Sequence, residues 1–154
     1  MVKEKKSGVM KLSLLRPVDS EWPVSSPYGM REHPISRKSK KHNGIDFSVP
    51  VGIAVKAMAG GRVFRSGWEN DRDFTSGFGL RVWQTCKIDG YEYYLWYGHL
   101  GKIEVVEDQN VKEGDTVGYS GNTGNSSGPH LHVQARRINT GDFYDMEFYD
   151  ERSA

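Results

Sequence analysis

The chain has 154 residues, of which 27% are charged and 36% are hydrophobic. This length fits one domain with a single core, and the composition argues against a disordered chain or a membrane span. Lys and Arg (21) nearly balance Asp and Glu (20), so a net charge of +1 gives no basis for nucleic-acid binding.

The first predicted segment is an N-terminal arm, residues 1–16, followed by one domain over residues 17–154. We expect its apolar stretch, residues 10–15, to lie against the body as an edge strand. Its first eight residues include the charged run Lys3 to Lys6 and contain no apolar run of the length that a signal peptide needs.

Turns and short strands dominate the next part of the chain. Pro23, Pro27, Gly29 and Pro34 break any helix in this region, and the polar residues 36–40 are predicted to form an exposed loop. Strands are predicted over residues 46–49, 53–58 and 62–65, where apolar residues partly alternate with polar ones.

The clearest predicted element is a hairpin with strands over residues 80–88 and 91–97. Asp89-Gly90 joins them and supplies the positive φ angles of a two-residue turn. The aromatic residues of the second strand are expected to pack in the sheet, and Tyr97 is a candidate for the edge of a groove. Cys86, the only cysteine, excludes an internal disulfide and is expected to be a buried small hydrophobic residue.

Two further strands are predicted over residues 111–119 and 131–135, separated by a loop rich in Gly, Ser and Asn. No segment has a sustained period of 3.6 residues. The predicted fold is therefore mainly β, with an antiparallel sheet core, little helix and long loops that form a substrate groove.

Residues that can do chemistry are few, because the chain has five histidines. His42 and Asp46 lie four residues apart across an Asn-Gly turn, and His130 and His132 lie two apart, on one face of a predicted strand. Two imidazoles and a carboxylate suit a catalytic Zn²⁺, which takes three protein ligands and keeps one open position. From spacing alone, a structural role in turns remains an alternative.

Several motifs, in order, resemble the lysostaphin-type zinc endopeptidases of peptidoglycan over residues 17–136. They are Ser25 to Ile35, His42-Asn-Gly-Ile-Asp46, Tyr97-Gly-His-Leu100, Val111 to Asp115, Gly118 to Gly124 and Gly128-Pro-His-Leu-His132. Gln134 stands where many relatives have Glu, and Gly98 where many have Ala; neither position is a ligand in the family.

The resemblance implies that His42, Asp46 and His132 bind Zn²⁺ and that His99 and His130 are the catalytic pair. His33 would have a structural role or lie at the substrate edge. The implied substrate is the stem peptide or cross-bridge of bacterial peptidoglycan, and the loop from Trp68 to Ser76 is expected to set specificity.

The same resemblance leaves alternatives in class and setting. A non-catalytic domain of this fold would instead bind or activate another wall hydrolase. We expect a monomer that acts at the bacterial cell wall, encoded by a phage as a bacteriolytic, antimicrobial endolysin or virion enzyme, or a mature fragment of an exported protein.

Overall fold

The structure is a computed structural model that describes residues 2–4, 10–32 and 39–150. Within these ranges it contains 14 strands and no helix. In chain order the strands are β1 (Val2–Glu4), β2 (Met10–Leu15), β3 (Val24–Ser26), β4 (Gly29–Glu32), β5 (Ser39–His42), β6 (Gly44–Phe47), β7 (Ala54–Lys56), β8 (Gly61–Trp68), β9 (Leu80–Ile88), β10 (Tyr91–Ile103), β11 (Asn110–Val111), β12 (Thr116–Ser120), β13 (Leu131–Arg137) and β14 (Phe143–Tyr149). The described residues form no helix that could span a membrane.

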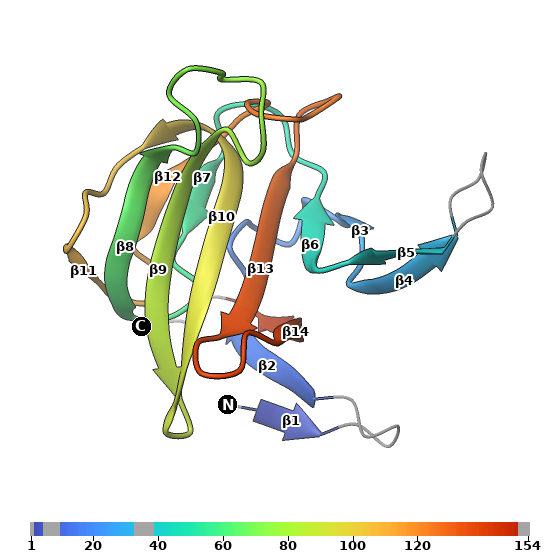
Figure 1. The fold of residues 1–154 in the computed structure, drawn as a ribbon, viewed down its shortest axis with the longest axis vertical. Coiled ribbons are helices and arrows are strands. Elements are labelled where there is room, and N and C mark those ends of the chain that lie inside the picture. The colour runs from blue at the N-terminus through green and yellow to red at the C-terminus, as the bar shows by residue number, and fades with distance from the viewer. Residues whose placement is uncertain (1, 5–9, 33–38, 151–154) are drawn as a thin grey trace.

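A curled sheet of 12 strands makes up most of the molecule, and its main path runs β1-β2-β14-β13-β10-β9-β8-β11. β12 leaves this path because it pairs with both β10 and β7. The sheet thereby folds over, and Figure 1 shows β7 and β12 behind β8, β9 and β10. β4 and β5 form a separate two-stranded sheet. The prediction of a mainly β fold is confirmed.

The core lies on one face of the strands, because their side chains alternate between the two faces. In β9, for example, Val82, Gln84 and Cys86 are buried, and Arg81 and Trp83 point to the other face. The predicted hairpin is confirmed: Asp89 and Gly90, at φ 50° and 84°, join β9 to β10.

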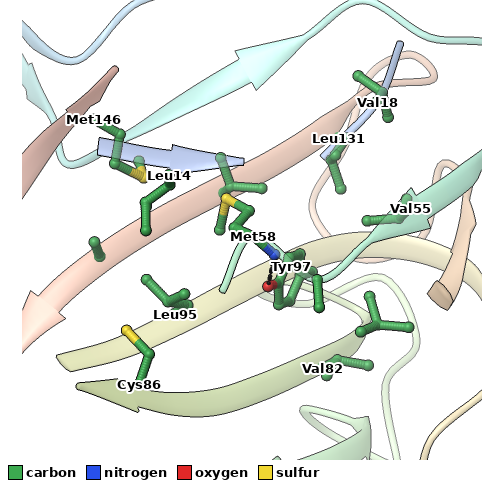
Figure 2. Packing of buried hydrophobic residues seen from close by; sticks show 14 of the residues in the cluster. Leu14, Val18, Val55, Met58, Val82, Cys86, Leu95, Tyr97, Leu131 and Met146 are labelled. Atoms are coloured by element: carbon green, nitrogen blue, oxygen red, sulfur yellow. Dashed lines mark hydrogen bonds between the residues drawn. The ribbon is translucent and has the colours of Figure 1, made fainter. Parts of the chain in front are cut away.

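Two residues with reactive side chains belong to this core. Cys86 is buried as predicted, and burial raises the pKa of its thiol to about 12. Tyr97 is fully buried, and its hydroxyl accepts a hydrogen bond from the Met58 amide at 2.8 Å (Figure 2) and donates one to Gln84. The expectation that Tyr97 borders a groove is therefore wrong, because its position in β10 points it into the core.

The N-terminal segment is part of the sheet. β2 pairs in parallel with β14 on one side and antiparallel with β1 on the other, so β2 is an internal strand and β1 takes the edge position. Leu12 and Leu14 are 0% and 1% exposed, and Figure 2 shows Leu14 next to Met146 of β14. The domain boundary at residue 17 remains a prediction, since β2 packs on the same core as the rest of the chain.

Candidate metal centre and flanking histidines

Neighbouring strands bring the two predicted ligand motifs together. β6 lies beside β13 (Figure 1) and pairs antiparallel with it. The register places Asp46 directly opposite His132. His42 is the last residue of β5, and Asn43 alone separates it from Gly44, the first residue of β6. This short connection places the imidazole of His42 beside the carboxylate of Asp46.

The three side chains converge on one locus. His132 Nδ1 lies 2.7 Å from Asp46 Oδ1, and His42 Nε2 lies 3.4 Å from Asp46 Oδ2. One possible ligand atom from each residue lies within 4.8 Å of the others. Two nitrogens and one carboxylate oxygen at this spacing fit the donor set of a catalytic zinc site.

In His42 and His132, the ring nitrogen that points away from Asp46 also has a partner. His42 Nδ1 donates to the Pro27 carbonyl at 2.9 Å, and His132 Nε2 donates to Gln134 Oε1 at 2.9 Å. His42 Nε2 and His132 Nδ1 are therefore the nitrogens that face Asp46.

The charge at the centre is that of a carboxylate between imidazoles. Burial alone would raise the pKa of Asp46, but hydrogen bonds and charge interactions with His132 and His42 together outweigh it and lower the pKa well below its usual range. Asp46 is therefore ionised at neutral pH. Such an anionic oxygen, partly buried beside two nitrogen donors, favours a cation at this locus.

His99 lies beside this centre on a β-bulge of β10. The pairing of β10 with β9 shifts between Tyr97 and Leu100, and His99 adopts a φ of 61°, which is unusual for a residue with a Cβ. Its amide donates to the Phe78 carbonyl at 2.7 Å. The bulge turns the imidazole of His99 out of the alternation of the strand and toward the metal centre.

His130 lies next to His99, and in both rings Nδ1 makes a hydrogen bond to a backbone carbonyl. Their ring centroids are 4.5 Å apart. His99 Nδ1 donates to the Thr123 carbonyl at 2.7 Å, and His130 Nδ1 to the Gly128 carbonyl at 2.9 Å. In the neutral form each ring then has its lone pair on Nε2, and His130 Nε2 lies 4.0 Å from Asp46 Oδ1.

Burial makes His99 a neutral imidazole. It lowers the pKa of His99 to about 4, together with the charges of His130 and His132, while the Thr123 carbonyl and Asp46 act in the opposite direction. At neutral pH, Nε2 of His99 is therefore free to accept a proton.

Two loops hold this arrangement. The loop over residues 69–79 contacts the loop over residues 121–130, since the Gly124 amide donates to the Phe74 carbonyl at 2.9 Å. Phe78 stacks on the His132 ring at a centroid distance of 5.2 Å. A Cβ at Gly98 would lie 3.0 Å from the Phe78 ring, so the glycine at this position leaves room for that ring.

The five residues predicted to bind the metal or act in catalysis thus meet in one place. They are His42, Asp46, His99, His130 and His132. His33 lies outside the described residues. Sequence reasoning missed the contacts of Thr123 and Gln134. Thr123 lies in the motif Gly118 to Gly124, whose residues carry no predicted contact with a histidine. For Gln134 a usable signal exists, because it follows His132 by two residues and so lies on the same strand face.

Comparisons with known proteins agree with this geometry. The sequence profile of Peptidase family M23 matches residues 40–145, which is more than half of the chain. The peptidoglycan DD-endopeptidase ShyA of Vibrio cholerae is 38% identical over 128 residues, covering 80% of this chain and 28% of ShyA. The glycyl-glycine endopeptidase ALE-1 of Staphylococcus capitis is 36% identical over 107 residues, covering 70% of this chain and 28% of ALE-1.

A solved structure shares the fold. The catalytic domain of the antimicrobial peptidase lysostaphin from Staphylococcus simulans aligns with a TM-score of 0.66 at 31% identity, covering 81% of this chain and 89% of that domain. The chain spans less than a third of the length of ShyA and of ALE-1. By sequence profile, relatives and fold, the chain belongs to peptidase family M23.

Proposed function

We propose that this chain is a zinc-dependent endopeptidase that hydrolyses peptide crosslinks of bacterial peptidoglycan. The observation that carries the proposal is the convergence of His42, Asp46 and His132 on one locus, with His99 and His130 beside it. The three converging residues would hold Zn²⁺, which supplies Lewis acidity toward the substrate carbonyl and activates water when bound.

The flanking histidines would move the proton. With Nδ1 fixed on a backbone carbonyl, His99 and His130 each offer Nε2 as an acceptor, and burial keeps His99 neutral at pH 7. One ring would take a proton from the attacking water, and the other would stabilise the charge that develops on the attacked carbonyl oxygen.

The substrate class follows from the relatives, and two scissile bonds fit. ShyA is a peptidoglycan DD-endopeptidase and ALE-1 a glycyl-glycine endopeptidase, so the bond is either a D-amino-acid crosslink or a glycine bridge. The loop from Trp68 to Ser76 would help to choose between them, because its residue Phe74 accepts a hydrogen bond from the loop over residues 121–130. The chain would act at the bacterial cell wall as a monomer.

The proposal is tested with His99→Asn, since Asn tolerates the left-handed backbone that His99 adopts. We expect this variant to bind zinc like the parent and to cleave purified peptidoglycan about 10²–10⁴-fold more slowly. His42→Ala is expected to lose the metal. Unchanged cleavage by His99→Asn would contradict the catalytic assignment.

A second measurement separates enzyme from binding module. The zinc content after purification at neutral pH identifies the metal. Mass spectrometry of fragments released from walls of different crosslink chemistry identifies the bond that is cut. A chain that binds no zinc and releases no fragment, but binds another wall hydrolase, would overturn the proposal.

A further inference from the structure

Beyond the ligands themselves, and resting on the zinc site proposed above, we propose that Gln134 is a positioning residue for the metal. Its side-chain carbonyl holds His132 in the tautomer that presents Nδ1 to the metal. The amide oxygen of Gln134 can only accept a hydrogen bond, so the 2.9 Å contact with His132 Nε2 keeps the ring proton on that nitrogen.

The opposite edge of the ring faces the other ligands. His132 Nδ1 is 2.7 Å from Asp46 Oδ1, on the side where the group of possible ligand atoms lies. Because the bond to Gln134 occupies Nε2, Nδ1 is the nitrogen that the ring can offer to a cation at this locus.

The strand geometry fixes this contact. His132 and Gln134 are two residues apart on β13 and so lie on the same face of the sheet. Gln134 is 7% exposed, and its direct partners across the strands are Trp96 on β10 and Gly44 on β6. Burial denies the amide competing water, which strengthens its hold on the ring.

Gly44 supplies the space that the pair needs. A Cβ at this position would lie 2.6 Å from Cε1 and 2.7 Å from Nε2 of His132, the edge of the ring that Gln134 contacts. The glycine of the His-Asn-Gly-Ile-Asp motif therefore leaves room for the hydrogen bond between His132 and Gln134.

The other ligand imidazole is held by the same kind of contact. His42 Nδ1 donates to the Pro27 carbonyl, also at 2.9 Å. Both imidazoles thus have a neutral oxygen acceptor behind them, and such partners of metal-bound histidines orient the ring and raise its basicity. The partner of His132 is a side chain, so its role can be tested by substitution.

The test measures the zinc dissociation constant by chelator competition. Gln134→Met keeps the length of the side chain and removes the acceptor, and we expect about 10–100-fold weaker zinc binding. Gln134→Glu keeps an acceptor and is expected to bind at least as tightly as the parent. In the zinc-loaded parent, long-range ¹H–¹⁵N spectra should show His132 bound through Nδ1 and protonated at Nε2.

The matched control is Gln84→Met, because Gln84 is also a buried glutamine but lies on the opposite face of the sheet and bonds to Tyr97 and Ala59. It should lower the melting temperature and leave zinc affinity unchanged. Parent affinity in folded Gln134→Met would overturn the inference. So would ¹⁵N shifts showing His132 bound through Nε2 in the parent, a result that needs no variant. A parent chain that binds no zinc would instead overturn the proposed function.

Discussion

His99 combines an unfavourable backbone conformation with a buried ring. Its φ of 61° costs roughly 1–2 kcal/mol for a residue with a Cβ. The bonds of its amide to Phe78 and of its ring to Thr123 offset this cost and hold the ring toward the metal centre. Backbone strain at His99 is thus tied to the position of the imidazole.

Burial of His99 predicts acid sensitivity of the metal-free protein. Its pKa falls from 6.5 to about 4 in the folded chain, so below pH 6.5 the unfolded chain binds the proton more readily. The free energy of unfolding should therefore fall as the pH drops from 6.5 to 4. In urea unfolding, the free energy of unfolding of His99→Asn should fall less than that of the parent over this pH range, by on the order of 2 kcal/mol. Equal losses in both proteins would contradict this.

At the scale of elements, the loop over residues 121–130 is tied to β9 and β10 through one hydroxyl. Thr123 Oγ1 accepts from the Leu80 amide at 3.1 Å and donates to the Leu100 carbonyl at 2.6 Å. The carbonyl of the same residue accepts from His99. The position of the loop and the orientation of the His99 ring therefore both depend on Thr123.

Thr123→Val keeps the shape of this side chain and leaves two backbone groups without their partner, at a cost of about 1–3 kcal/mol. We expect a melting temperature lower by several degrees, about tenfold lower kcat and an unchanged zinc dissociation constant. The control is Thr85→Val, whose hydroxyl donates only to the Arg62 carbonyl at 3.4 Å. A kcat equal in both variants would refute a special role for Thr123.

The elements show how far the sequence could predict the structure. The hairpin at Asp89-Gly90 and the proximity of His42, Asp46, His99, His130 and His132 were predictable, because turn chemistry and ordered motifs are local signals. β14 was not predicted, since its parallel partner β2 lies over 130 residues away and pairing at that distance leaves no local pattern. Which ring nitrogen of His132 faces Asp46 was not predictable either, because it depends on the register of β6 and β13.

At the scale of the whole molecule, β2 joins the N-terminal segment to the core. Leu14 is 1% exposed, so Leu14→Ala should lower the free energy of unfolding by about 2–5 kcal/mol. Val106→Ala, at a side chain 68% exposed, is the control and should change it by less than about 0.5 kcal/mol. A chain of residues 17–154 that unfolds at the same temperature as the full chain would show that the arm is dispensable.

A metal at the proposed site would bind together segments far apart in the chain. Asp46 and His132 are 86 residues apart, and His42 belongs to a third strand. If zinc binds only the folded chain, a free zinc concentration a thousand times the dissociation constant adds about 4 kcal/mol to the free energy of unfolding.

For a domain of this size, that gain raises the melting temperature by roughly 10 °C. Removing the metal with a chelator should therefore lower the melting temperature by this amount in the parent and not at all in His42→Ala. An equal chelator effect in both proteins would place the metal elsewhere, because His42→Ala removes one of the three converging side chains and leaves the strands intact.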